Sequence, residues 1–179
     1  MTLPGLLLAV HVAAGTAGLL LAGPVLFVRK RRGAHTWLGR AYAIAAALLC
    51  LTAFVLVAYD PAALAGLAVL GVLTVGWVGA GVWLARRRPR LGAPGRWRVW
   101  HLNCMGSSVI AFVTAFVVQV ANGHPLAWVA PTLIGAPLIS WRTRREVAAL
   151  TRRNRRVDQG AGAAGAGVSR PGSLDHAVT

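Results

Sequence analysis

The chain has 179 residues, of which 56% are hydrophobic and only 13% are charged. Soluble domains carry about 25% charged residues, so this composition argues against a soluble fold and favours a protein that lies in a lipid bilayer. The formal net charge of +15 would favour nucleic-acid binding in a soluble protein. Here the basic residues gather in clusters beside apolar segments, so we expect no nucleic-acid partner.

Five apolar segments follow one another along the chain. A membrane-spanning helix needs about 20 mostly apolar residues. The predicted segments are residues 3–28, 41–59, 62–85, 102–121 and 126–141. The last segment is short and contains Pro131 and Pro137, which neighbouring helices can accommodate within a span. We therefore predict a kinked fifth span, with a re-entrant or interfacial segment as the alternative.

The positions of the basic residues predict how these segments are oriented. Residues 29–40 contain five Lys or Arg, residues 86–98 contain six, and residues 142–156 contain seven. The short turns at residues 60–61 and 122–125 contain none. With five spans all three clusters lie on one side, which the positive-inside rule assigns to the cytoplasm. The predicted fold is an all-α bundle of five transmembrane helices in the cell inner (plasma) membrane, with the N-terminus outside and the C-terminus cytoplasmic.

The same pattern divides the chain into three regions. Residues 1–141 form the predicted transmembrane bundle, and residues 142–156 form a basic juxtamembrane helix that lies on anionic lipid. Residues 157–179 are rich in Gly and Ala and poor in large apolar residues, so we predict a disordered tail. The expected partners are the lipid bilayer, anionic headgroups at the basic rim, and a second copy of the chain or another membrane protein.

A first group of polar side chains is predicted to point into the outer half of the bundle. At 100° per residue, His11 shares a helix face with small residues that allow close packing. One face of the fourth segment carries His101, Met105, Ser108, Phe112, Ala115 and Gln119. His11 and Gln119 each lie about 25 Å from the cytoplasmic ends of their helices, at about 1.5 Å per residue. We therefore predict an outer cluster of His11, Gln119 and Tyr59, with Asp60 at a similar level.

A second predicted cluster lies on the cytoplasmic side and consists of His35, Arg40 and His101. His35 and Arg40 fall in the connection before the second segment, and we expect one of them to contact the cytoplasmic end of the fourth. The two clusters are separated by roughly 20 Å or more at about 1.5 Å per helical residue. His11 and His101 therefore cannot ligate the same metal ion or haem iron.

Two short strings in the chain are distinctive. Residues 31–42 read RRGAHTWLGRAY, and residues 101–116 read HLNCMGSSVIAFVTAF. Together they resemble the DUF2306-type bacterial membrane proteins, and the resemblance covers about residues 8–140. The matching positions are Gly33, His35, Leu38, Gly39, Arg40, Tyr42, His101, Met105, Gly106, Ser108, Thr114, Ala115 and Phe116. The resemblance implies a multi-span inner-membrane protein and supplies no activity.

The sequence contains no complete catalytic triad, phosphate-binding loop or metalloprotease motif. We therefore expect a non-enzymatic accessory or scaffold role. One alternative is a redox protein that binds haem or quinone, with His35 and His101 as the candidate haem ligands, and another is a small transporter. A third is a site for an anion or a phospholipid headgroup, since guanidinium groups suit phosphate geometry. Its candidate residues are His35, Arg40, Arg96, Arg98 and His101.

Overall fold

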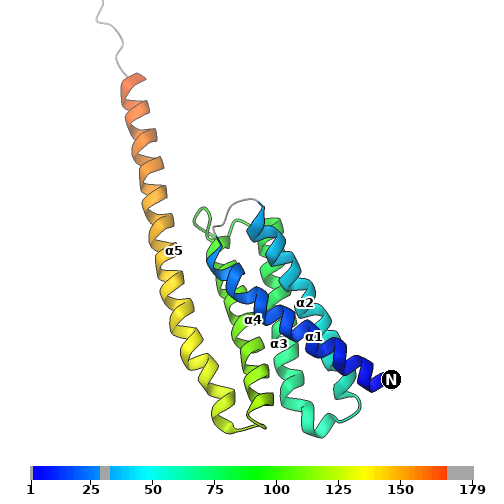
Figure 1. The fold of residues 1–179 in the computed structure, drawn as a ribbon. Coiled ribbons are helices and arrows are strands. Elements are labelled where there is room, and N and C mark those ends of the chain that lie inside the picture. Colours follow the sequence, from blue (N-terminus) through cyan, green and yellow to red (C-terminus); the bar gives the residue numbers. More distant parts are fainter. Residues whose placement is uncertain (1, 29–32, 169–179) are drawn as a thin grey trace, which may run out of the picture.

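The computed structural model describes residues 2–28 and 33–168, which form five α-helices (Figure 1). The helices are α1 (Leu3–Phe27), α2 (Ala34–Val57), α3 (Pro61–Arg87), α4 (Trp97–Val120) and α5 (Pro125–Val168). Within the described residues, the helices α1 to α4 are long and apolar enough to cross a membrane. The predicted all-α class is confirmed, and four of the helices could span a membrane.

Proline and glycine mark the two turns that contain no basic residue. Pro61 begins α3 and Pro125 begins α5, at a helix position where an N–H would have no partner in the helix. Between α4 and α5, Asn122 and Gly123 take left-handed backbone conformations, with φ of 48° and 77°. The N–H of Gly123 donates to the carbonyl of Val118 at 2.8 Å and closes the end of α4. Both predicted turns are confirmed.

The first four helices form a closed ring. Helix α1 packs on α2 and α4, and α3 also packs on α2 and α4, so α2 and α4 lie diagonally opposite each other. Helix α5 packs on α4 and lies outside the ring (Figure 1). Helix α1 crosses the others obliquely in this view, and its C-terminal end lies near the start of α4.

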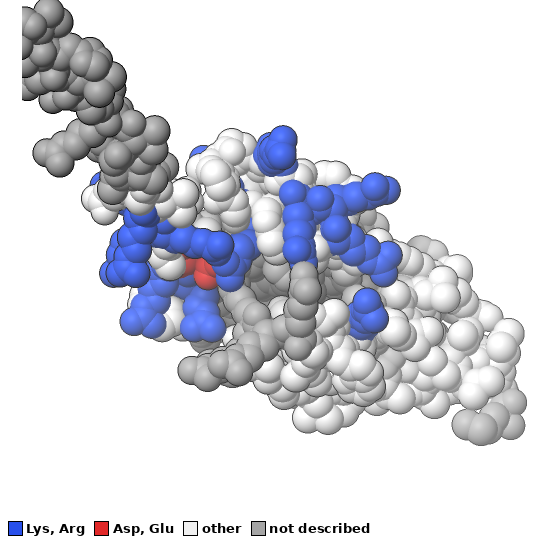
Figure 2. Space-filling model, turned by 90° about the horizontal axis from the view of Figure 1, so that it is seen from above, with Lys and Arg blue, Asp and Glu red and all other residues white. Residues whose placement is uncertain are grey.

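The described arginines gather at one end of the bundle, which we call the basic end. It contains the C-terminus of α1, the N-terminus of α2 and the connection between α3 and α4. Figure 2 looks onto this end and shows the described Arg side chains grouped there. The turns between α2 and α3 and between α4 and α5 form the opposite end. Helix α5 continues well beyond the basic end (Figure 1).

Helix α2 begins earlier than its apolar segment, which corrects one prediction. His35 and Arg40 lie in the first two turns of α2, and not in the connection before it. Gly33, with φ of 131°, precedes the first helical residue. The residues between Gly33 and the apolar segment include no proline, so the helix can extend past the apolar segment. The hydropathy pattern therefore located the span but not the end of the helix.

Helix α5 is longer than predicted and crosses two predicted boundaries. It continues without a break from the proposed fifth span through residues 142–156 and on to Val168. Residues 157–168, predicted as part of a disordered tail, have a helical backbone. Residues 142–150 run beside the basic end, where Glu146 meets Arg98 and Leu150 lies near Gly95, and the helix then continues past the bundle (Figure 1). Residues 169–179 of the predicted tail lie outside the described residues.

The best-packed part of the ring lies in the half nearer the basic end. Its buried side chains come from all four helices of the ring and are Ala22, Tyr42, Ala46, Val78 and Phe112. The small residues of α1 permit this packing. A Cβ atom on Gly18 would lie 2.5 Å from Cζ of Phe112, so the aromatic ring occupies the space that the glycine leaves.

Two reciprocal glycine–isoleucine contacts hold α5 against α4. A Cβ atom on Gly106 of α4 would lie 2.8 Å from Cδ1 of Ile139, and one on Gly135 of α5 would lie 2.5 Å from Cγ1 of Ile110. Each isoleucine therefore occupies the space left by a glycine of the other helix. Such close backbone approach is a common way for helices to associate in an apolar solvent.

We expect Gly135→Ala to destabilise the protein by about 1–3 kcal/mol, because the added methyl group would overlap the β-branched side chain of Ile110. Gly79→Ala is the matched control, since nothing lies within 4 Å of its Cβ position. That substitution should stabilise the protein by up to about 1 kcal/mol through helix propensity. Thermal unfolding in detergent, followed by circular dichroism, compares the two. Equal effects would contradict the packing argument.

Candidate ligand cavity between the first four helices

A cavity of about 540 Å³ lies inside the ring, in the half remote from the basic end. All four helices of the ring line it, and most of the lining side chains are aliphatic or aromatic. The polar side chains in its wall are His11, Thr16, Cys50, Thr74 and Gln119. Small-molecule sites in proteins are typically apolar cavities of about 300–1,000 Å³ with a few polar groups. The size and the lining of this cavity therefore suit a small organic molecule.

His11 is held in the cavity wall by a hydrogen bond to α2. Its Nδ1 atom lies 3.0 Å from Oγ1 of Thr52. The hydroxyl of Thr52 donates to the carbonyls of Leu48 and Leu49, at 2.8 and 2.9 Å. The inward orientation predicted for His11 is confirmed, because Ala14 and Ala22 on the same face are buried. The bond also links α1 to α2 in the half that contains the cavity.

The structure brings together two members of the predicted outer cluster. His11 and Gln119 both line the cavity, from α1 and from α4. Tyr59 and Asp60 are exposed at the opposite end and are not part of the wall. The polar stripe predicted for α4 does face inward, since Ser108 and Phe112 are buried and Ala115 lines the cavity. The functional role of the cluster stays a prediction.

Phe112 separates the cavity from the packed core. It lines the cavity and also belongs to the buried cluster of the ring. Its ring lies against Gly18 of α1, and its centroid is 6.1 Å from that of Tyr42, with the planes tilted by 41°. Tilted aromatic pairs at this separation are favourable. The cavity is therefore closed toward the basic end by an aromatic contact.

Tyr42 reaches across the ring from α2 to α4. Its hydroxyl lies 3.1 Å from Oγ of Ser108, and the Ser108 hydroxyl donates to the carbonyl of Met105 at 2.8 Å. Both buried hydroxyl protons have an acceptor when Tyr42 donates to Ser108 and Ser108 donates to Met105, so we assign the tyrosine as the donor. The two side chains are the largest fully buried ones in the described residues. They join two helices whose backbones are not in direct contact.

The surroundings of the three residues in the predicted cytoplasmic cluster can be described one by one, and their grouping stays a prediction. Nδ1 of His101 donates to the carbonyl of Gly81 on α3 at 2.8 Å. Nδ1 of His35 is buried and makes no hydrogen bond to the described residues. Arg40 is exposed on α2. The haem, quinone and transport alternatives stay predictions.

Polar contacts at the basic end connect α5 to the ring. Nε of Arg98 on α4 lies 3.1 Å from a carboxylate oxygen of Glu146. Arg142 donates to the carbonyl of Leu26 at the end of α1, at 3.3 Å. A cationic side chain at a helix C-terminus is favourable, because the last carbonyls carry partial negative charge. α5 is thus attached to α1 and α4 where its apolar part ends.

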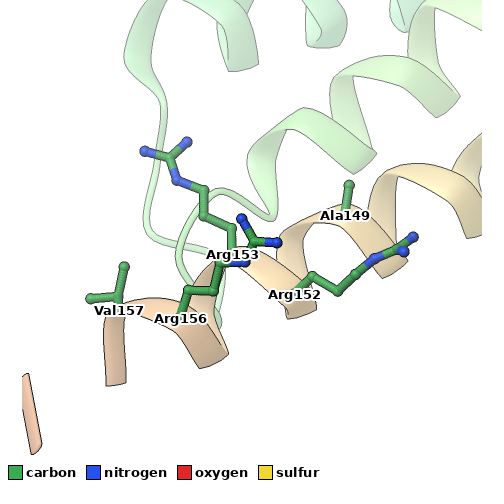
Figure 3. A pocket seen from close by; sticks show the side chains of 5 residues that line it. All are labelled: Ala149, Arg152, Arg153, Arg156 and Val157. Carbon is green, nitrogen blue, oxygen red and sulfur yellow. The ribbon is translucent and has the colours of Figure 1, made fainter. Parts of the chain in front are cut away.

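A shallow depression lies farther along α5, beyond this attachment. Figure 3 shows the side chains around it, which are Ala149, Arg152, Arg153, Arg156 and Val157. All five belong to one helix, and all are exposed. Three guanidinium groups make the surface electropositive and would attract anions without selecting one of them.

The chain was compared with protein-family models, with curated protein sequences and with solved structures. None of the three comparisons finds a match. The resemblance to DUF2306-type proteins therefore stays a prediction. Within the described residues, no group of three or more His, Cys, Asp or Glu side chains could hold a metal ion. The cavity and its polar groups are the features from which a function can be inferred.

Four residues of this region were not singled out by the sequence. Thr52 positions His11, while Thr16, Cys50 and Thr74 line the cavity. A polar residue within an apolar helix tends to face other helices, and this could have indicated the three threonines. The partner of each could not have been identified, because helical periodicity gives the direction of a side chain but not the helix that it meets.

The Tyr42–Ser108 hydrogen bond predicts that loss of the serine hydroxyl destabilises the protein more than loss of the tyrosine hydroxyl. Ser108→Ala should cost about 1–3 kcal/mol, because it leaves the buried tyrosine hydroxyl without a partner. Tyr42→Phe should cost less, about 0.5–1 kcal/mol, since the serine keeps its bond to Met105. The double variant should be more stable than Ser108→Ala alone. Thermal unfolding of the three variants tests this, and additive losses would rule out the assigned donor.

Proposed function

We propose that this chain is an integral protein of a bacterial inner membrane that binds a small lipophilic molecule within the bilayer and catalyses no reaction. The observation that carries the proposal is the cavity of about 540 Å³ that four apolar helices line. Its polar groups are too few and too dispersed for a catalytic set, but they suit the orientation of a bound molecule. An accessory or carrier role follows from this.

The position of the cavity supports entry from the lipid phase. It lies in the half of the ring that contains no arginine, and large hydrophobic residues are exposed on the outer faces of the surrounding helices. Leu8, Leu56, Leu67 and Phe116 are among its wall residues. Lipid tails are as apolar as these side chains, so burial of apolar surface alone would not favour a ligand over lipid. Selectivity would come from the shape of the cavity and from its few polar groups. A membrane-soluble ligand would reach it without crossing the charged end.

The first part of α5 supports a fifth span. Residues 125–141 would extend about 25 Å at 1.5 Å per residue, against a hydrocarbon core of about 30 Å. This part packs along α4 through Ile139, while Trp128 at its start lies against Gly66 of α3. With five spans, every basic cluster lies on the cytoplasmic side, as the positive-inside rule requires.

The basic end supports contact with anionic lipid. In a five-span arrangement, Arg86, Arg87 and Arg142 lie where a helix leaves the bilayer. Arginine side chains at that depth can place their guanidinium groups among the headgroups. The arginines beyond Ala149 on α5 would stand in the cytoplasm (Figure 3). A second copy of the chain or another membrane protein remains a proposed partner on the exposed apolar faces.

Reporter fusions test the proposed topology. Alkaline phosphatase fused after Gly123 should be active, and the same enzyme fused after Thr179 should be inactive, since only the first site is outside the cytoplasm. Green fluorescent protein should give the reverse pattern. A fusion after Arg90 is the cytoplasmic control. Active phosphatase at the C-terminus would show that α5 does not span, and would leave four spans.

A cavity-filling variant tests ligand binding. Ala115 lines the cavity, so Ala115→Trp should place an indole in it, while Ala47 is exposed on α2 and Ala47→Trp is the control. The wild-type protein in phosphatidylcholine nanodiscs is photolabelled with tritiated adamantyl diazirine, a small apolar probe. We expect labelling at Leu67 and Leu70, which line the cavity.

Labelling of these two leucines should fall at least fivefold in Ala115→Trp and should be unchanged in Ala47→Trp. Val69 and Val72, which are exposed on the lipid-facing side of the same helix, are the internal reference. Ala115→Leu serves as a milder variant with a smaller decrease. No labelling of the leucines in the wild-type protein, with normal labelling of the valines, would refute the cavity as a binding site.

A further inference from the structure

We infer that the cavity takes a lipid-soluble alcohol or phenol, whose hydroxyl group donates a hydrogen bond to Nε2 of His11. The inference rests on the proposed function and specifies its ligand. It depends on where the single proton of a neutral His11 ring is placed.

The contacts of Thr52 place that proton. A hydroxyl group has one hydrogen, and the hydroxyl of Thr52 directs it to the carbonyls of Leu48 and Leu49. This back-bonding is common for threonine in helices. The Thr52 oxygen can then only accept in its 3.0 Å contact with Nδ1 of His11. The ring therefore carries its proton on Nδ1.

The second ring nitrogen is left as an acceptor. A neutral imidazole has one donor and one acceptor nitrogen, so Nε2 of His11 presents a lone pair. The charged form, which would donate from both nitrogens, is disfavoured within an apolar bundle. Among the described residues, the hydrogen-bond partners of the ring are Thr52, at Nδ1, and the backbone of Leu49, and both belong to α2. His11 also lines the cavity. Nε2 is the ring atom left to meet a ligand.

Thr74 has a hydroxyl in the cavity wall that can also act as a hydrogen-bond acceptor toward a ligand. The hydroxyl of Thr74 donates to the carbonyl of Leu70 at 2.7 Å, so its oxygen also offers a lone pair. Cys50 contributes a thiol, which is a weak donor. Gln119 can both donate and accept, but it is exposed near the end of α4. The buried part of the wall thus presents acceptors, which select a ligand that donates.

An apolar molecule with one hydroxyl group fits this arrangement. Its body would fill the aliphatic part of the cavity, and its hydroxyl would meet the Nε2 lone pair. An ether or a ketone of the same shape has no proton to donate, and would leave the imidazole nitrogen unpaired in an apolar site. Buried acceptors without a partner are costly, so a site of this kind discriminates against such analogues.

A matched pair of probes tests the inference. The probes are tritiated 4-hexylphenol and tritiated 4-hexylanisole. The anisole carries a methyl group in place of the hydroxyl proton of the phenol. Binding to the full-length protein in phosphatidylcholine nanodiscs is measured by scintillation proximity, with partitioning into empty nanodiscs subtracted. We expect the phenol to bind about tenfold more tightly than the anisole, which corresponds to about 1.4 kcal/mol.

Two histidine variants locate the effect. His11→Phe keeps an aromatic ring but removes both nitrogens, and should reduce the preference for the phenol to less than twofold. His124→Phe is the matched control, because His124 is exposed in the turn before α5, and it should keep the preference. The comparison of the two probes in the wild-type protein needs no variant, so it holds even if His11→Phe fails to fold.

The outcomes separate this inference from the proposed function. Saturable binding of both probes with equal affinity would overturn the hydroxyl inference and leave the cavity as a binding site. A preference that persists in His11→Phe would overturn the assignment to His11. The absence of saturable binding of either probe to the wild-type protein would overturn the proposed function together with the inference.

Discussion

The ring of Phe112 is the point on which the rest of the bundle depends. It lies against the backbone of Gly18 on α1 and beside the ring of Tyr42 on α2, and it shares a buried cluster with Val78 of α3. One side chain of α4 therefore touches or adjoins all three other helices of the ring. Because apolar helices gain little from the hydrophobic effect inside a bilayer, close packing of this kind must supply the association.

The polar contacts inside the ring follow a common rule. The hydroxyls of Thr52, Thr74, Ser108 and Thr114 each donate to a carbonyl of their own helix. A hydroxyl whose proton is used in this way can join another helix only as an acceptor. Bonds between helices then need a donor from elsewhere, and Tyr42 and His11 supply one each.

Sequence patterns predicted the directions of side chains better than their partners. The faces that contain His11 and Ser108 point inward as expected, because a helical period fixes which residues share a face. The start of α2 and the continuation of α5 were not predicted, since hydropathy reports where lipid ends and not where a helix ends. The Tyr42–Ser108 pair could not be predicted either. It depends on which helices lie diagonally opposite, and that is a property of the packed ring.

The unequal distribution of contacts accounts for the position of the cavity. At the basic end, Arg142 joins α5 to α1 and the Arg98–Glu146 pair joins α5 to α4, so the helices are held together there. Among the described residues in the other half of the ring, α1 makes its polar contact with α2 through His11, and no side-chain hydrogen bond joins α1 to α4. The residues of α1 and α4 in this half instead face a common cavity. A bundle joined at one end and by a central aromatic contact can therefore keep an internal space at its other end without losing its fold.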